Sequence, residues 1–173
     1  MPVIILLALN QIKMKKSILV IAFLATVFVQ KTFAQDSTQQ HQLSQLLTQY
    51  YNIKDALVAG NGNLASVKAE EFIKIANSID YKVISEGNIN ALLKDASPIS
   101  ETKDINKQRQ HFANLSNNMA ELAKSVKLTT EPIYKAYCPM KKTNWLSNEK
   151  AIKNPYYGNA MLTCGNVVET INQ

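Results

Sequence analysis

Apolar residues recur every three or four positions through much of the chain, a spacing that places side chains on one face of an α-helix. The clearest stripes cover 43–58, 64–79 and 104–127. The first stripe includes Lys54, whose aliphatic stem can lie on the apolar face. These patterns predict three amphipathic helices, of which the longest, over 104–127, has the most regular stripe.

Glycine, asparagine and proline mark the ends of the predicted helices. Asn61-Gly62-Asn63 predicts a turn between the first two. Gly87-Asn88 divides 81–95 into two short helices or one kinked helix, and Ser97-Pro98 predicts a further boundary. The second helix is expected to bury one side, which comprises Leu64, Val67, Phe72, Ile75, Ala76 and Ile79.

The last third of the chain has a different character. Turn formers and aromatic residues are frequent there, both cysteines lie there, and no run of alternating apolar and polar residues indicates a strand. We therefore expect an all-α fold, a helical bundle of about four helices with an irregular C-terminal segment that contains the aromatic residues and cysteines. A single helical domain would cover 43–173, after a polar N-terminal tail over 35–42.

Residues 1–34 have the organisation of a leader with a secretory signal peptide. Met14-Lys15-Lys16 forms a positive start, 17–29 is apolar, and Ala34 is a small residue at the expected cleavage point. Met14 is then the true start and 1–13 a mis-called extension; the alternative is a long uncleaved anchor. We expect a periplasmic or secreted protein with no membrane span after cleavage.

The net charge of +6 does not indicate a nucleic-acid-binding protein. Four of the 19 basic residues lie in the leader, which leaves 15 basic residues against 13 acidic ones. Nucleic-acid binding requires a dense lysine and arginine surface, so no nucleic-acid partner is expected.

Enzyme motifs are missing from the sequence. It has no glycine-rich phosphate loop, HExxH, GxSxG or CxxC. Of its two histidines, His41 is interpreted as exposed and His111 as a residue beside the apolar stripe of its helix. No nucleophile or acid-base pair can be named, so we expect no enzyme and assign no catalytic or cofactor-binding residue.

Sulfur ligands in the last third are the residues that could carry chemistry. Cys138 and Met140 flank Pro139, which favours extended backbone and would place both side chains on one side. Met161 and Cys164 are three positions apart, as are neighbours on a helical face. Thiolate and thioether sulfurs select soft ions such as Cu(I). The sequence therefore predicts a metal site of Cys138, Met140, Met161 and Cys164, with Cu(I) as its ion.

Other interpretations of the two cysteines remain open. Two cysteines in an exported protein commonly form a disulfide, and a Cys138–Cys164 bond would stabilise the fold by about 3 kcal/mol. The methionines would then be core filler. Thiol redox chemistry is a third possibility. The segment Asn154-Pro155-Tyr156-Tyr157-Gly158 could present tyrosines to a ligand, but we expect its rings to pack on the helices.

Several short motifs follow one another along the chain, namely Arg109-Gln110-His111-Phe112, Leu115-Ser116, Tyr137-Cys138-Pro139-Met140, Trp145-Leu146-Ser147, Asn154-Pro155-Tyr156-Tyr157-Gly158 and Met161-Leu162-Thr163-Cys164-Gly165. In this order they resemble the envelope family called domain of unknown function 3347. The resemblance covers about 43–171. The Cys-Pro-Met block is also similar to that of heavy-metal-binding modules, where a histidine usually follows; here Lys141-Lys142 follow.

The resemblance implies a helical domain of an exported bacterial protein. It also implies a setting similar to that of heavy-metal and copper efflux adaptors, because some members are fused to them or found beside them. It implies no reaction. We therefore expect a non-enzymatic exported accessory protein that binds or handles copper or similar soft ions in the cell envelope, with heavy-metal efflux or other envelope proteins as partners. The alternative is a structural or protein-interaction module that is stapled by a Cys138–Cys164 disulfide and has no metal role.

Overall fold

A computed structural model describes residues 38–172 of the chain. The chain divides into two units, 1–38 and 39–173, and the described residues belong to the second unit except for Thr38. The predicted leader, with its start at Met14 and its cleavage point after Ala34, lies outside the described residues. No helix within the described range is long and apolar enough to cross a membrane.

The helical part consists of a first helix over 38–58, followed by α2 (Gly62–Ser78), α3 (Glu86–Ser100) and α4 (Ile105–Ser125). Side chains cap three of these helices at their first turn. Asn61 caps α2, Ser85 caps α3 and Asp104 caps α4, each by accepting hydrogen bonds from backbone N–H groups that have no partner inside the helix. The predicted helices over 43–58, 64–79 and 104–127 are therefore confirmed, and residues 38–42 are already helical.

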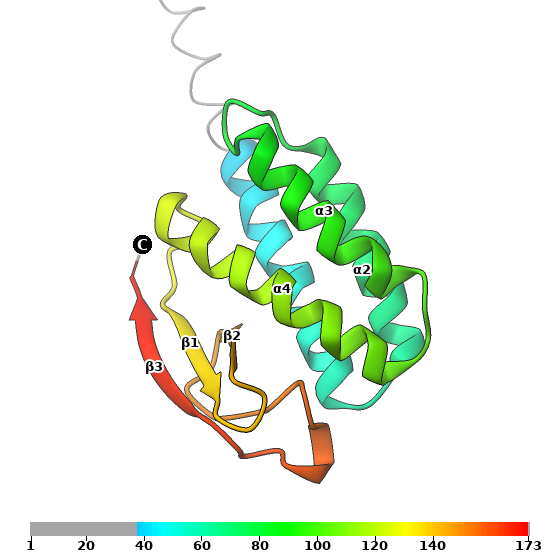
Figure 1. The fold of residues 1–173 in the computed structure, drawn as a ribbon. Helices are drawn as coiled ribbons and strands as arrows, with labels where there is room; N and C mark the ends of the chain where they lie inside the picture. Colours follow the sequence, from blue (N-terminus) through cyan, green and yellow to red (C-terminus); the bar gives the residue numbers. More distant parts are fainter. Residues whose placement is uncertain (1–37, 173) are drawn as a thin grey trace, which may run out of the picture. The chain divides into compact units, whose positions relative to one another are not determined.

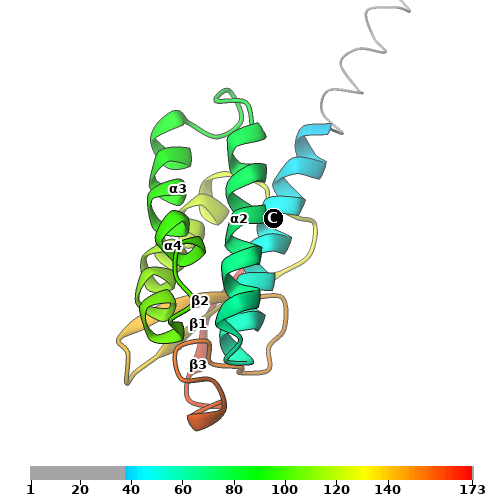
Figure 2. The ribbon, with the colours of Figure 1, turned by 90° about the vertical axis from the view of Figure 1, so that its right-hand side faces the viewer.

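The helices pack in sequence, with α2 beside α3 and α3 beside α4 (Figures 1 and 2). Phe112 and Met119 of α4 are completely buried, as their regular stripe predicts. Lys54 is only 2% exposed, and its ammonium lies 2.9 Å from the carboxylate of the exposed Asp55. The core therefore forms along the predicted apolar stripes, and the stem of Lys54 takes part in it.

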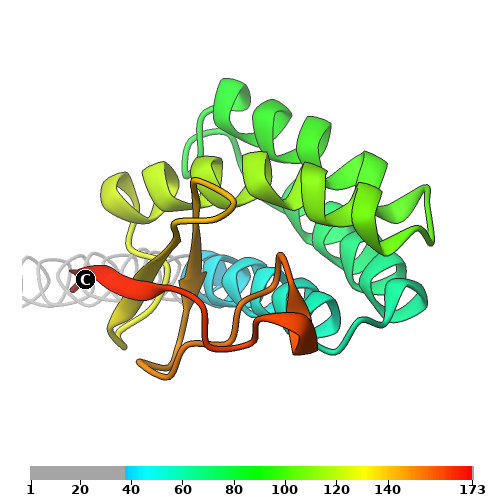
Figure 3. The same ribbon diagram turned by 60° about the horizontal axis from the view of Figure 1, so that its bottom comes forward.

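The expectation of an all-α fold is wrong, because the C-terminal region forms a three-stranded antiparallel sheet. Its strands are β1 (Ile133–Cys138), β2 (Thr143–Ser147) and β3 (Asn166–Ile171), in the spatial order β2-β1-β3. The short 3-10 helix η1 (Gly158–Ala160) lies between β2 and β3. The sheet lies beside the bundle and contacts α4 through β2 (Figures 1 and 3).

The strands escape a sequence search because two of them lack a simple alternation of buried and exposed residues. In β1 the buried residues are Ile133, Ala136 and Cys138, so two half-buried residues separate the first two. At Lys135 and Ala136 the pairing with β3 contains a bulge, because Val168 of β3 has no partner in β1. In β2 the neighbouring residues Trp145 and Leu146 are both buried. Only β3 alternates regularly, and six residues are too few to distinguish a strand from an irregular segment.

Two predicted helix breaks are also wrong. Gly87 lies in the first turn of α3, just after the capping residue Ser85, so it starts a helix and does not interrupt one. Pro98 lies inside α3, which continues to Ser100 because Ile99 is completely buried in the core. Burial of one such side chain stabilises by about 1.5–3 kcal/mol, which exceeds a local preference against helix before proline.

The buried face of α2 is rotated from the predicted one. Leu64 is 41% exposed and Val67 is 48% exposed. Small residues occupy the contact instead, since Ala65 and Ala69 are completely buried. Their size allows α2 to approach its neighbours closely, so the most hydrophobic residues do not all face inward.

Candidate functional site

Cys138 is the last residue of β1 and is completely buried. It pairs with Thr143 of β2 across a four-residue turn over 139–142. The turn closes because Lys142 adopts a φ of 55° and its N–H donates to the carbonyl of Cys138 at 2.8 Å. The N–H of Lys141 points at the sulfur itself and lies 3.4 Å from Sγ of Cys138. The hairpin thus holds this thiol inside the protein at the end of the sheet.

Cys164 lies close to Cys138, although 26 positions of sequence separate them, because Nδ2 of Asn154 reaches both Sγ of Cys138 and the carbonyl of Cys164. Burial raises the pKa of Cys164 above its usual value, and the charge of Cys138 and a side-chain hydrogen bond with it raise it further. Both residues are free thiols in the structure; Cys138 is buried and Cys164 is half-buried. The pair therefore has one inner sulfur and one that lies nearer the surface.

Asn154 holds the two cysteine segments together. It is completely buried, and its Nδ2 donates to Sγ of Cys138 at 3.2 Å and to the carbonyl of Cys164 at 2.7 Å. Its Oδ1 accepts from the N–H of Tyr156 at 2.8 Å, and its own N–H donates to the carbonyl of Leu162. One amide side chain thus bridges β1 and the two segments on either side of η1.

Gly165 allows the chain after Cys164 to pass close to the sheet. Its φ is +139°, and a Cβ there would lie 2.8 Å from the ring of Trp145 and 2.8 Å from the carbonyl oxygen of Tyr137. No larger residue fits without displacing these groups. The glycine of the Cys-Gly motif therefore has a packing role beside the thiol pair.

The two methionines are arranged differently from the prediction. Residues 139–142 form a turn, so the extended geometry that would place Met140 beside Cys138 ends at the cysteine, and Met140 is 62% exposed. Met161 is half-buried and ends η1, and the N–H of Cys164 donates to its carbonyl at 3.1 Å. This contact is a turn, not the predicted helical face. Of the four predicted ligands, the structure brings together the two cysteines.

Aromatic rings connect this region to the helices. Tyr156 is 5% exposed, and its ring centroid lies 6.0 Å from that of Phe112 and 6.2 Å from that of Trp145. Its hydroxyl donates to the carbonyl of Asn144. The prediction that the rings of this segment pack on the helices is confirmed for Tyr156.

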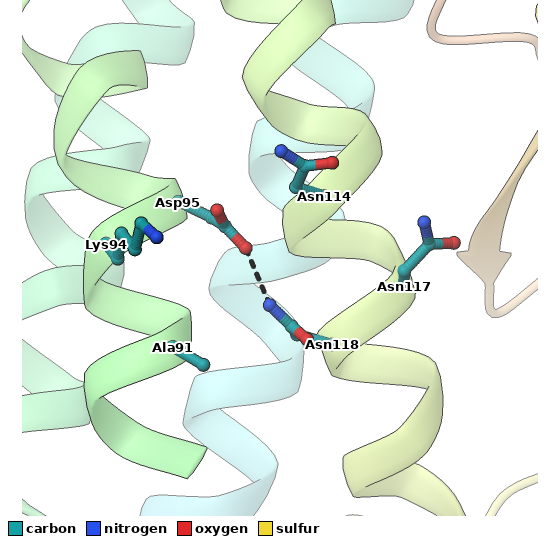
Figure 4. A pocket seen from close by; sticks show the side chains of 6 residues that line it. All are labelled: Ala91, Lys94, Asp95, Asn114, Asn117 and Asn118. Atoms are coloured by element: carbon teal, nitrogen blue, oxygen red, sulfur yellow. Dashed lines mark hydrogen bonds between the residues drawn. The ribbon is translucent and has the colours of Figure 1, made fainter. Parts of the chain in front are cut away.

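A polar cleft of about 350 Å³ lies between α3 and α4 (Figure 4). Asn118 donates from Nδ2 to the buried Asp95 at 2.6 Å. Burial raises the pKa of Asp95, although the hydrogen bond from Asn118 and the positive charges of Lys94 and His111 oppose the shift. The cleft contains no sulfur ligand, and its other side chains are Ala91, Asn114 and Asn117.

Within residues 38–172, no group of three or more His, Cys, Asp and Glu side chains lies close enough to hold a metal ion. The histidines stand apart from the thiol pair, since His41 is exposed on the first helix and His111 is half-buried on α4. Their predicted exposed and boundary positions are confirmed.

Asn154 is the site residue that sequence reasoning missed. In sequence it resembles a turn residue before proline, and its hydrogen bonds join positions that are ten and 16 residues away. The signal that could have identified it is its place in the Asn-Pro-Tyr-Tyr-Gly motif, midway between two cysteine motifs.

Comparison with known families gives one match, which lies in the helical part of the chain. Residues 46–131 match the family described as Protein of unknown function (DUF3347), and the chain belongs to this family. The match covers the helices, and the thiol pair lies beyond it. No curated protein and no solved structure gives a significant match.

Proposed function

We propose that this member of the DUF3347 family is a non-enzymatic, exported accessory protein that binds Cu(I) through Cys138 and Cys164. The observation that carries the proposal is the contact between two thiols from distant parts of the chain, one buried and one half-buried. Two thiolates are soft ligands that prefer Cu(I) to hard ions such as Mg²⁺ and Ca²⁺. Export rests on the leader, and the partner would be a copper or heavy-metal efflux protein of the envelope.

The surroundings of the thiol pair support a preformed site. Asn154 fixes both segments, and Gly165 permits the close approach beside Trp145, so the two sulfurs need no large rearrangement to share an ion. Met161 lies one turn from Cys164 and can add a thioether. Met140 is on the exposed turn beside Cys138, where it can cover the ion from the solvent side.

The same contact favours the second candidate, a structural module stapled by a Cys138–Cys164 disulfide. Complete burial of Cys138 is the specific observation for this role, because a buried thiol is slow to meet an incoming ion. The disulfide would remove both thiolates, so the two functions exclude each other in any one molecule. The oxidation state of the protein in its native compartment therefore distinguishes them.

The first experiment counts free thiols in protein isolated from the native host without reductant, with alkylation and mass spectrometry. Cu(I) binding predicts two alkylated cysteines, or two that become alkylated once copper is removed. A quantitative disulfide that persists at the potential of the compartment would refute the metal role and support the staple.

The second experiment is competition between a Cu(I) chelator and the reduced protein. We expect one Cu(I) per chain, with loss of binding in the Cys138→Ser, Cys164→Ser double variant. Binding should weaken as the pH falls, because each thiol must lose a proton, and the raised pKa of Cys164 moves this loss to higher pH. Equal affinity in the wild type and the double variant would overturn the site.

Methionine variants then measure the thioether ligands separately. Met161→Leu should weaken Cu(I) binding more than Met140→Leu, because Met140 is 62% exposed on a turn while Met161 is half-buried. The exposed Leu162→Met provides a control in which sulfur is added next to Met161. If neither leucine variant changes the affinity, the site contains only the two cysteines.

A further inference from the structure

We propose that a cavity between α4 and the segment 156–160 binds a small oxyanion that carries a carboxylate or phosphate group. The cavity has a volume of about 290 Å³. Two cationic side chains, Arg109 and Lys141, line it together with the polar residues Asn106 and Gln110. This site is separate from the proposed copper site, since neither cysteine lines the cavity.

The charge of the cavity is uncompensated. No aspartate or glutamate is among its lining residues. Neither Arg109 nor Lys141 forms an ion pair with any carboxylate in the part of the chain that the structure describes. The cleft between α3 and α4 differs in this respect, since it is lined by both Lys94 and Asp95. An anion in the cavity would therefore meet positive charge and no opposing negative side chain.

The fold fixes the orientation of Arg109. Its Nε donates to the carbonyl of Pro155 at 2.9 Å, and one Nη2 hydrogen donates to the carbonyl of Leu57 at 2.9 Å. Gly158 makes this position possible, because a Cβ at that residue would lie 2.6 Å from Nη2. The guanidinium is thus held by neutral carbonyls, which leave its full positive charge and its Nη1 hydrogens available for a ligand.

Burial strengthens the attraction between the Arg109 guanidinium and an anion, because less water screens the charge. Arg109 is half-buried, and burial lowers its pKa from the ordinary value because the charged form loses water contacts. A bound oxyanion would restore stabilisation to the guanidinium through paired N–H donors. Lys141, on the exposed turn after Cys138, would supply a second positive charge.

The size and the remaining lining define the ligand class. A volume near 300 Å³ is at the lower end of the range for small-molecule sites, so it suits a compact ion better than a nucleotide. Asn106 and Gln110 offer amide groups, and Tyr157 offers a hydroxyl that can donate to an oxyanion. The buried ring of Tyr156 forms an apolar wall beside them.

The test is titration of isotopically labelled protein with inorganic phosphate and, separately, with citrate, followed by amide chemical shifts at constant ionic strength. We expect saturable shifts that cluster at 106–110, 141 and 156–160. The two titrations distinguish the sources, since a phosphate site responds to the first ion and a carboxylate site to the second. Protein with Cys138→Ser and Cys164→Ser should bind the anion as the wild type does, so failure of the copper proposal leaves this one intact.

Adjacent lysines provide matched variants. Lys141→Gln should weaken anion binding about threefold to tenfold, and Lys141→Glu should weaken it further. Lys142→Gln and Lys142→Glu change the same net charge one residue away, but Lys142 does not line the cavity, so they should retain most of the affinity. Equal effects at the two positions, or shifts that grow linearly without saturation, would overturn the site and indicate non-specific attraction to a basic protein.

Discussion

Replacement of Asn154 by Asp tests the idea that one buried amide organises the cysteine region. The substitution keeps the shape of the side chain and its Oδ1, which accepts from the N–H of Tyr156 at 2.8 Å. It replaces Nδ2, which donates to the carbonyl of Cys164 and to Sγ of Cys138, with an oxygen. Two hydrogen bonds are therefore lost, and the new oxygen faces two acceptors.

The expected cost follows from these contacts. A buried acceptor that loses its donor costs about 1–3 kcal/mol, and Cys164 loses the closer of the two bonds, at 2.7 Å. A carboxylate at a position that is completely buried adds a desolvation cost. We expect the free energy of unfolding at pH 7 to fall by about 3 kcal/mol or more, measured by urea denaturation.

The loss should depend on pH in a specific direction. Burial and the facing acceptors should raise the pKa of the new carboxyl above its unfolded value of about 3.9. A raised pKa favours the protonated form in the folded protein, so the deficit relative to wild type should be smallest below about pH 4 and should grow as the pH rises through the folded pKa. The protonated carboxyl can then donate one of the lost hydrogen bonds.

The matched control is Asn159→Asp, the same substitution at an exposed position in η1. It should change the unfolding free energy by no more than about 0.5 kcal/mol at either pH. The reasoning fails if Asn154→Asp is as stable as this control at pH 7. The reasoning also fails if Asn154→Asp loses the same unfolding free energy at pH 4 and at pH 7. That result would mean that the new carboxylate is not buried beside hydrogen-bond acceptors.

Three other measurements follow from the packing. Gly165→Ala should reduce the unfolding free energy by more than about 2 kcal/mol, since its Cβ would lie 2.8 Å from the ring of Trp145 at a φ of +139°. Gly87→Ala, whose Cβ would have no atom within 4 Å, should be neutral or stabilise the protein by up to about 1 kcal/mol. Equal shifts of the thermal unfolding midpoint in the two variants would contradict this difference. Tyr50→Phe should reduce the free energy of unfolding by about 1–3 kcal/mol, because the hydroxyl of Tyr50 accepts from the N–H of Leu146 at 2.9 Å inside the core. An unchanged midpoint of urea denaturation would contradict this and show that water replaces the hydrogen bond. In near-ultraviolet circular dichroism, Gly165→Ala should also alter the tryptophan signal, and Gly87→Ala should not.

The sequence determined the helices because their evidence is local. The stripe over 104–127 repeats for several turns, and α4 (Ile105–Ser125) follows it with Phe112 and Met119 fully buried. Side-chain caps such as Asp104 are also local, since they bond to N–H groups two or three residues away. The packing role of Tyr156 could also be anticipated, because Asn-Pro and Gly on either side of the tyrosine pair indicate turns and large aromatic rings tend to be buried.

The tertiary structure decided everything that depends on pairing across the chain. The sheet forms from strands of five and six residues, with a bulge beside Lys135, and such short segments acquire their stability from partners and not from their own pattern. The end of α3 shows the same effect, since burial of Ile99 overrides the local preference against helix next to Pro98.

The candidate sites also combine features that the sequence indicated with features that only the fold determined. The sequence indicated Cys138 and Cys164 as candidate ligands from their residue type alone, and the fold brings their two segments together through Asn154. The turn over 139–142 then moved Met140 into solvent, because a strand's alternation ends where its hydrogen bonds end. The basic cavity at Arg109 had no signal in the sequence, because its cations, amides and phenol come from α4, the β1–β2 turn and the turn before η1 and meet only when these elements pack.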